Sequence, residues 1–443
     1  MSIESLGAKL IEKALPRASK RPVQEVVAKL APDLLALDRK AIARLDHRSA
    51  VDIIAKLNAR LRKLDPEALT TKYEHMAKNP RRFFTGQPEL MAYDLRELAR
   101  KLKGRTIVQG DMHLRNFGTM VDAKGGLGVL LNDFDDAAIG PGAVDFNRLA
   151  TATVLSGREL GLTTAQTQEL VKSLGGAYYD TLGAIAHGAG GQPVAPKQIL
   201  SLLEKARKVD PVAWLEQQAP KVNGKRLLLR NEGQLEVSTK VAGGVKKALG
   251  SYQKQLGAAL EGYQVTDVVK VVSGTGSIGQ PRFLALLERG AGDEPVILQL
   301  KGQAAAPLAR FHLPGPKFSS QAERNVKLGQ LLDDGLDPYR GTAPGNLLVE
   351  RVRPVDGGLE IPDLKQAEDF QAVIKYYAAT AAKAHANGAK LGLATAQEIL
   401  DTLGPKPSFV DGLVNFAHQY ADQTERDHAA FVKALATNPL LVK

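Results

Sequence analysis

Apolar residues recur at helical spacing near the start of the chain and again toward its end. Ile54, Leu57, Leu61 and Leu64 lie three or four positions apart, which places them on one face of a helix. Prolines interrupt the pattern earlier in residues 1–65, so we expect two or three helices there. The same periodicity predicts helices over 143–187, 199–208, 241–260 and 321–332, and mostly helical structure from residue 364 onward.

Between these helical segments the pattern changes to short apolar runs. Two of them, at 105–108 and 129–131, are followed at once by polar residues, as at the end of a strand. Further β-branched and apolar runs predict strands over 265–272, 283–288, 296–300 and 346–352, and a hairpin over 225–237. We therefore expect a small mixed sheet with one helix, inserted between helical segments.

Composition sets outer limits on this arrangement. The chain has 443 residues, of which 44% are hydrophobic, enough for a large core and for two or three domains. No run of 18 uncharged apolar residues is present, so we expect no membrane-spanning helix. The first residues lack the apolar core of a signal peptide, and the chain has no cysteine. A cytoplasmic location is therefore expected, and disulfides and cysteine-bound metals are excluded.

The charge balance favours anionic partners. The formal net charge is +11, which leaves three interpretations open: a solvated basic surface, a funnel for an anionic substrate, or a nucleic-acid face. Aromatic residues make up only 5% of the chain, few for a platform that stacks single-stranded bases. Nucleic acid is thus the least favoured of the three.

Two loops carry residues suited to phosphoryl transfer. The stretch Gly110–Gly118 follows the first short strand, and Asn132–Asp136 follows the second. Phosphoryl transfer requires a carboxylate that orients the attacking hydroxyl, and hard oxygen ligands that hold Mg²⁺ on the phosphates. Asp111 fits the first requirement, and Asn116 and Asp133 fit the second.

Plainer explanations exist for each of these residues. Asp and Asn are common in turns, so either loop alone could simply end a strand. Asp145, which opens the next predicted helix, fits a helix N-cap and loop anchor better than a metal ligand. Asp135 fits a third metal ligand or a surface acid equally well, and a lone His113 is more often structural.

A glycine-rich segment follows the strand predicted at 265–272. Gly274, Gly276 and Gly279 form a G-x-G-x-x-G pattern that includes Ser277. Such a loop can bind phosphates through its backbone N–H groups, but the same pattern marks dinucleotide-binding proteins when a helix follows it, and it can also be only a tight turn. Pro281 can open a helix or precede a strand, so the pattern alone is undecided.

The strand predicted at 296–300 leads directly into Lys301. A lysine there can neutralise nucleotide phosphates, and Glu323 on the next predicted helix is a candidate partner that would hold it. A lysine that protects an edge strand and a surface glutamate are the alternatives. The order of strand, glycine loop, strand, lysine and helix with glutamate favours a nucleotide-binding lobe.

With both groups of residues in view, the chain resembles known phosphotransferases. Gly110–Gly118 and Asn132–Asp136 resemble the catalytic and metal-binding loops of aminoglycoside and choline phosphotransferases. This resemblance implies that Asp111 is the catalytic aspartate, and that Asn116 and Asp133 bind metal.

The chain resembles even more closely a bacterial family known as domain of unknown function twenty-two fifty-two. The stretches that carry this resemblance, within about residues 72 to 390, are Phe83–Gly86, Gly110–Gly118, Asn132–Asp136 with Gly140-Pro141, Val272–Gly279, Leu298–Lys301, Glu323-Arg324 and Ala384–Ala386.

Two departures from the phosphotransferase pattern stand out. Gln109 takes the place of the histidine that often precedes Gly-Asp. The order is also reversed, because Asp111 and Asp133 precede the glycine pattern and Lys301. Chain order is not a chemical requirement, and circular permutation relocates termini while preserving contacts.

We therefore expect an α+β fold of the two-lobed protein-kinase-like type, circularly permuted. Residues 262–355 would form the nucleotide-binding small lobe, and residues 346–352 the hinge that meets adenine. Residues 66–261 and 356–443 would form the large catalytic lobe, after a helical N-terminal extension of residues 1–65.

The expected function is ATP- and Mg²⁺-dependent phosphoryl transfer to an unidentified hydroxyl acceptor of small-molecule size. A nucleotide and this acceptor are the expected partners. A nucleotide-sensing pseudokinase, AMP transfer on the same fold, and nucleic-acid binding are the alternatives. The presence of Asp111, Asn116, Asp133 and Lys301 together argues against a pseudokinase, since a site without turnover can lose any of them.

Overall fold

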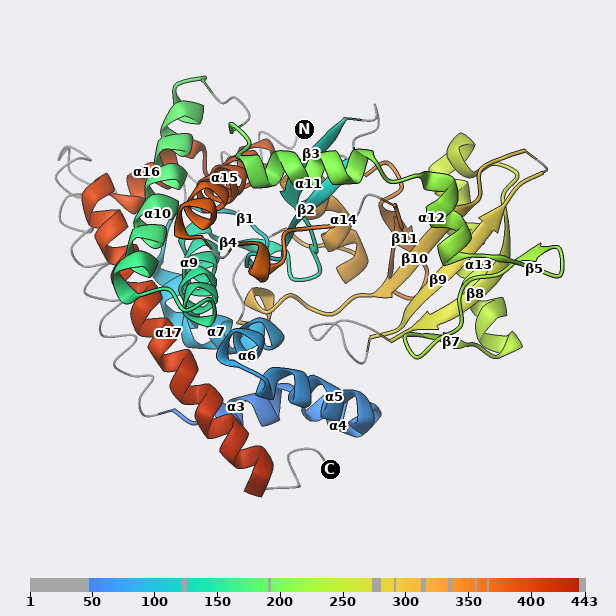
Figure 1. Cartoon of the computed structure of the whole chain (residues 1–443), viewed down its shortest axis with the longest axis horizontal. Helices are drawn as coiled ribbons and strands as arrows, with labels where there is room; N and C mark the ends of the chain where they lie inside the picture. The colour runs from blue at the N-terminus through green and yellow to red at the C-terminus, as the bar shows by residue number, and fades with distance from the viewer. Residues whose placement is uncertain are drawn as a thin grey trace.

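The fold combines a mostly helical part with a part built on a six-stranded sheet (Figure 1). The structure is a computed structural model that describes residues 48–121, 126–189, 193–272, 280–290, 292–311, 316–333, 337–354, 357–364 and 366–437. Helices and sheet occur together in one chain, which confirms the α+β class.

The helical part contains most of the helices and two short antiparallel pairs of strands. Its helices are α3 (Ala50–Leu57), α4 (Ala59–Leu64), α5 (Pro66–Ala77), α6 (Pro80–Gly86), α7 (Pro88–Asp94), α8 (Arg96–Lys101), α9 (Gly142–Glu159), α10 (Thr164–Ala186), α11 (Lys197–Arg207), α15 (Ala367–Ala386), α16 (Ala396–Leu403) and α17 (Lys406–Thr437). Strand β1 (Arg105–Val108) pairs with β4 (Ala138–Pro141), and β2 (Phe117–Val121) pairs with β3 (Leu127–Leu131). Both strands expected before the acidic loops, β1 and β3, are present.

The sheet part is an antiparallel sheet with the strand order β11-β12-β10-β9-β8-β7. Its strands are β7 (Gln234–Glu236), β8 (Gln264–Val271), β9 (Arg282–Glu288), β10 (Val296–Gly302), β11 (Gly341–Ala343) and β12 (Leu347–Arg351). Helices α12 (Pro211–Gln218), α13 (Thr239–Leu256) and α14 (Gln321–Leu332) accompany it, with the small hairpin of β5 (Lys221–Val222) and β6 (Lys225–Arg226). The four longer strands and α14 confirm the expected elements.

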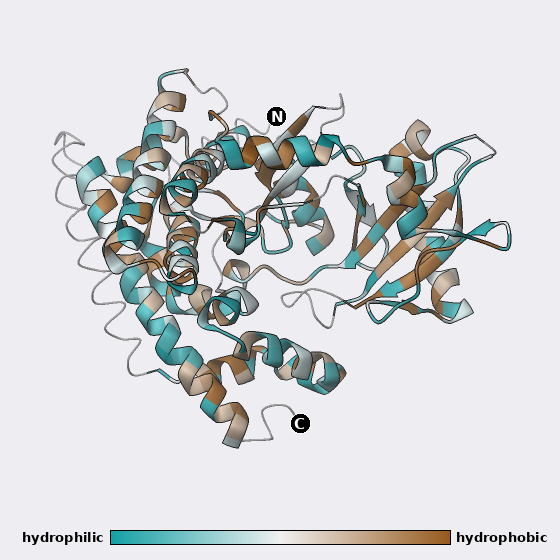
Figure 2. Cartoon of the chain, in the orientation of Figure 1, coloured by the Kyte–Doolittle hydropathy of each residue, from teal (hydrophilic) through white to brown (hydrophobic). Residues whose placement is uncertain are grey.

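The two faces of the sheet bury alternate residues, as the period of two in a strand requires. On one face Leu298 and Leu300 pack with Leu249 and Tyr252 of α13. On the opposite face Ile297 lies in a separate apolar cluster with residues of α12. Figure 2 shows the apolar segments along these strands.

This packing corrects two expectations. Residues 211–260, which were assigned to the large lobe, pack on the sheet instead, because α12 and α13 cover its faces. The hairpin expected over 225–237 is reduced to a tight antiparallel bridge between Asn231 and Gln234, since β6 pairs with β5 whereas β7 joins the sheet beside β8. Local sequence does not reveal that residues of β7 pair with residues 33 to 37 positions further along the chain.

The described residues of the expected N-terminal extension are packed against the end of the chain. Ile54 of α3 and Phe431 of α17 share one buried apolar cluster with α5 and α6. Arg48 binds the carboxylates of both Asp94 and Asp427, with Nη2 to oxygen distances of 2.6 and 2.8 Å. Within the described ranges, no helix has the length and apolar character needed to cross a bilayer.

Candidate functional site

Three segments that are distant in the sequence meet where the helical and sheet parts adjoin. The loop after β1 carries Asp111 and Asn116, the turn after β3 carries Asp133, and the end of β10 carries Lys301. A backbone hydrogen bond links the first two segments, in which the N–H of Asn132 donates to the carbonyl of Asn116 at 3.0 Å. Lys301 is 168 residues from Asp133, yet its Nζ lies 3.2 Å from the Oδ1 of that aspartate.

Asp145 in the first turn of α9 fixes the start of the loop that carries Asp111. Its Oδ2 accepts the N–H of Gln109 at 2.8 Å, and its Oδ1 accepts the N–H of Gly110 at 3.0 Å. The role of loop anchor is therefore confirmed. The N-cap assignment is wrong, because the N-cap of α9 is Pro141 and Asp145 lies inside the helix.

A buried chain of hydrogen bonds supports this anchor. His385 places Nε2 3.2 Å from Oδ2 of Asp145, and its Nδ1 lies 2.7 Å from the hydroxyl of Tyr178.

Gly110 has a φ of 87°, and a Cβ there would lie 2.0 Å from the carbonyl oxygen of Asp136. Only glycine allows the loop to run this close to the second acidic turn.

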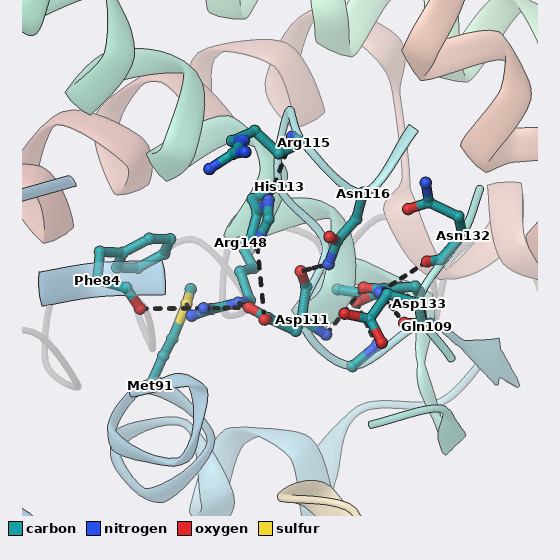
Figure 3. A network of polar contacts seen from close by, with 12 residues as sticks. Phe84, Met91, Gln109, Asp111, His113, Arg115, Asn116, Asn132, Asp133 and Arg148 are labelled. Carbon is teal, nitrogen blue, oxygen red and sulfur yellow. Dashed lines mark hydrogen bonds and ion pairs between the residues drawn. The ribbon is translucent and has the colours of Figure 1, made fainter. Parts of the chain in front are cut away.

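Asp111 is held by an arginine that sequence reasoning did not identify. Arg148 of α9 donates to Oδ1 of Asp111 through Nε at 2.8 Å and also through Nη2 (Figure 3). The same guanidinium donates to the carbonyl of Phe84 at 3.1 Å and lies over the Phe84 ring at 4.2 Å. Burial raises the pKa of Asp111 to about 7, although the positive charge of Arg148 opposes this effect.

His113 faces the other carboxylate oxygen of Asp111. Its Nε2 lies 3.6 Å from Oδ2, and its Nδ1 accepts the backbone N–H of Arg115 at 3.2 Å. Burial and the neighbouring Arg148 lower the pKa of His113 to about 3. The ring is therefore neutral near pH 7, with its proton on Nε2 and directed toward Asp111.

Asn116 and Asp133 retain oxygen atoms that can accept a further ligand. Asn116 Nδ2 donates to the backbone oxygen of Asp111 at 2.9 Å, and Oδ1 has no hydrogen-bond partner among the described residues. The Asp133 side chain is 53% exposed, and Lys301 is its one ion-pair partner within the described chain. Asp133 has a φ of 53°, in the left-handed region, which a short polar side chain tolerates better than most. The Lys301 ammonium lowers the pKa of Asp133.

Lys301 is buried on a central strand. Strand β10 pairs with β9 on one side and with β12 on the other, so the edge-strand explanation of this lysine does not hold. Its Nζ contacts Asp135 Oδ2 as well as Asp133. Burial alone would lower the pKa of Lys301, but the two carboxylates outweigh it and raise the pKa. The lysine is consequently a fixed positive charge.

Glu323 does not meet Lys301 in the structure. Glu323 lies on α14 as expected, but its carboxylate binds Lys327 at 2.7 Å and the backbone N–H of Ser319 at 2.5 Å. The assignment of Glu323 as the lysine's partner is wrong for this structure. The helical period explains the difference, because the α14 face that points into the protein carries Ala322, Asn325 and Gly329.

The glycine pattern falls outside the described residues. Gly274, Gly276, Ser277 and Gly279 lie in the segment 273–279, which the structure does not describe. The strands on either side of it, β8 and β9, pair antiparallel, and β9 begins at Arg282. A strand in this place argues against the dinucleotide-binding alternative, which requires a helix.

The donor atoms suit magnesium better than a metal of the zinc type. Among the described residues, no three His, Cys, Asp or Glu side chains gather as a metal site would require. Magnesium instead needs only one or two carboxylates and keeps several of its waters. Oδ1 of Asn116, which no described residue engages, and the half-exposed carboxylate of Asp133 fit such a ligand set, whereas Asp135 is already bound by protein groups.

Sequence reasoning missed Arg148 and the polar residues around Asp135. A signal for Arg148 was present, because it lies three positions after Asp145 and therefore on the same face of α9. Gln303 and Asn325 carried no comparable signal, since their side chains meet only through tertiary packing.

In a comparison with protein families, one family model matches residues 62–434 of the chain, which is most of its length. The family is described as uncharacterised proteins conserved in bacteria, DUF2252, and the chain belongs to it. The resemblance to this family is thus confirmed. No curated protein and no solved structure matches the chain.

Proposed function

We propose that the chain is an ATP- and Mg²⁺-dependent phosphotransferase that acts on a hydroxyl group, with a circularly permuted kinase-like fold of two lobes. One observation carries the proposal: buried Lys301, on a central strand of the sheet part, contacts the acidic turn of the helical part beside Asp111. A lysine, a metal-binding aspartate and an orienting aspartate are the groups that phosphoryl transfer requires in one place.

In this proposal Asp111 orients the acceptor hydroxyl and accepts its proton. A pKa of about 7 suits a general base at neutral pH, because the group is partly ionised and still basic. Arg148 occupies Oδ1, so Oδ2 beside His113 is the oxygen that would take the proton.

The remaining groups would bind the nucleotide. Lys301 would neutralise phosphate oxygens, and the sheet part would hold the nucleotide, with residues 346–352, which include β12, as the hinge that meets adenine. Asn116 and Asp133 would hold Mg²⁺, which supplies positive charge where negative charge develops on the phosphates. The reversed order of the two lobes does not alter these roles.

The test is a screen for ATP consumption with a panel of hydroxyl compounds, such as sugars and amino alcohols, in the presence of Mg²⁺. Mass spectrometry of the products then separates phosphate transfer from AMP transfer. An acceptor that gains phosphate with the wild-type chain, and not with Asp111→Asn, supports the proposal. A wild-type chain that does not bind ATP would remove it.

A further inference from the structure

The carboxylate of Asp135 is held by side chains from three directions. Lys301 Nζ contacts its Oδ2, and Gln303 Nε2 donates to its Oδ1 at 2.9 Å. Asn325 of α14 adds a second donor to Oδ1, through Nδ2 at 3.2 Å. Both Gln303 and Asn325 are buried.

The donors around Asp135 are themselves fixed. Asn325 Nδ2 also donates to Oε1 of Gln303 at 3.1 Å, so the two amides brace each other. The backbone of Gln303 exchanges hydrogen bonds with Asn346, which donates Nδ2 to the Gln303 carbonyl at 2.7 Å and accepts the Gln303 N–H at 3.2 Å. The buried Oδ1 of Asn325 has no hydrogen-bond partner among the described residues. The Asn325 amide is therefore oriented by the groups that it donates to, and the carboxylate of Asp135 is one of them.

Helix α14 also holds the backbone of the acidic turn. Arg324 Nη2 donates to the carbonyl of Asp135 at 2.6 Å, and Nη1 donates to the carbonyl of Ala137. Two adjacent residues of α14, Arg324 and Asn325, thus bind the main chain and the side chain of Asp135. Any displacement of α14 would be transmitted to the partner of Lys301.

Asp133 and Glu323 differ from Asp135 in the respects that matter. Asp133 has Lys301 as its one side-chain partner within the described chain, and it is half exposed. Glu323 binds Lys327, on the surface of the same helix. Asp135, by contrast, has both carboxylate oxygens occupied by protein donors and little capacity left for a metal.

We propose that Asp135 is the positioning residue that holds Lys301, and that α14 maintains it through Asn325 and Gln303. The role of Lys301 in binding phosphate rests on the proposed function. The pairing of Lys301 with Asp135 does not depend on it. Asp135 does the work expected of Glu323 and is not a metal ligand, so Asn116 and Asp133 are left as the ligand set. Regulation of Lys301 would act through the position of α14.

The pairing is tested by thermal unfolding of the full chain without nucleotide, in a double-mutant cycle. Lys301→Met and Asp135→Asn should each lower Tm. The Tm of the double variant should not fall below the Tm of the less stable single variant. Lys301→Met combined with Glu323→Gln should be additive instead. If Asp135→Asn does not fold, Asn325→Ala replaces it, and a smaller effect that depends on Lys301 is expected.

The role in the reaction is tested by the ATP and Mg²⁺ dependence of turnover. Asp135→Asn should raise KM for ATP about tenfold, which corresponds to a loss of about 1.4 kcal/mol in binding, and leave the Mg²⁺ dependence unchanged. Asp411→Asn, an exposed aspartate on α17, is the matched control and should change neither quantity.

The experiments distinguish a failure of the Asp135 inference from a failure of the proposed function. A cycle in which Glu323, and not Asp135, is coupled to Lys301 would overturn the inference, as would a loss of Mg²⁺ affinity in Asp135→Asn. A wild-type chain without ATP binding would end the proposed function, while the unfolding cycle would still decide which acid holds Lys301.

Discussion

Replacement of Asp145 by asparagine should destabilise the chain strongly, although only one oxygen changes to NH₂. The carboxylate accepts backbone N–H groups from Gln109 and Gly110 on separate oxygens, and His385 adds a third partner. Asparagine keeps one oxygen that can accept an N–H group. Its NH₂ group is itself a donor and would face the other backbone N–H, which then has no acceptor. Asp145, Gln109 and His385 are all buried, so water cannot replace the missing acceptor.

The magnitude follows from the hydrogen bonds that the substitution removes or weakens. An unsatisfied buried N–H group costs roughly 1–3 kcal/mol, and the retained bonds lose their charge-assisted strength of about 1 kcal/mol. We therefore expect Asp145→Asn to lower the free energy of unfolding by about 3 kcal/mol. Loss of turnover should accompany it, because the loop that carries Asp111 begins at the anchored residues.

Urea unfolding followed by circular dichroism measures this difference, with Asp180→Asn as the matched control. Asp180 is exposed on α10 and pairs with Lys406 at 2.7 Å. A surface ion pair of this kind contributes about 0–1 kcal/mol, so the control should unfold almost as the wild type does. Equal unfolding midpoints for Asp145→Asn and wild type would refute the assignment of Asp145 as the loop anchor.

Two further predictions concern the metal and pH. Asp133→Ala should abolish turnover, and the wild type should lose turnover in excess chelator; ATP consumption that continues under chelation would contradict the metal assignment. Burial raises the pKa of Asp267, but Arg230 and backbone N–H donors outweigh it, so the pKa is lowered on folding. Its contribution to stability is present above the unfolded pKa, near 4, and is lost as pH falls through the lower folded value. Asp267→Asn should therefore have a lower free energy of unfolding than wild type at pH 7, and this difference should shrink at a pH below about 4. Urea unfolding at the two pH values measures it, and a difference that stays constant would contradict this reasoning.

The fold was predictable where the local pattern was strong. The runs that became β8, β9 and β10 are apolar segments of strand length, rich in β-branched residues in β8 and β10, and α14 matches its predicted bounds of 321–332. Strand pairing was less accessible, because β7 finds β8 only through tertiary structure.

The candidate site shows the same division. Lys301 and Asp133 were predictable because each stands at the end of an apolar strand. The partner of Lys301 was not, since helical spacing identifies a helix without showing which of its faces will meet the lysine. Glu323 carries the expected charge but pairs with Lys327, whereas Asp135 lies where its carboxylate contacts Lys301.

The most direct test of the central claim compares wild type and Asp111→Asn for both turnover and nucleotide affinity. Turnover of ATP with an acceptor should fall about 10²–10⁴-fold, the usual effect of removing a general base. Nucleotide affinity, measured by calorimetry with Mg²⁺-ATP, should remain nearly unchanged, because Asp111 orients the acceptor and not the nucleotide. Unchanged turnover in Asp111→Asn would contradict the account.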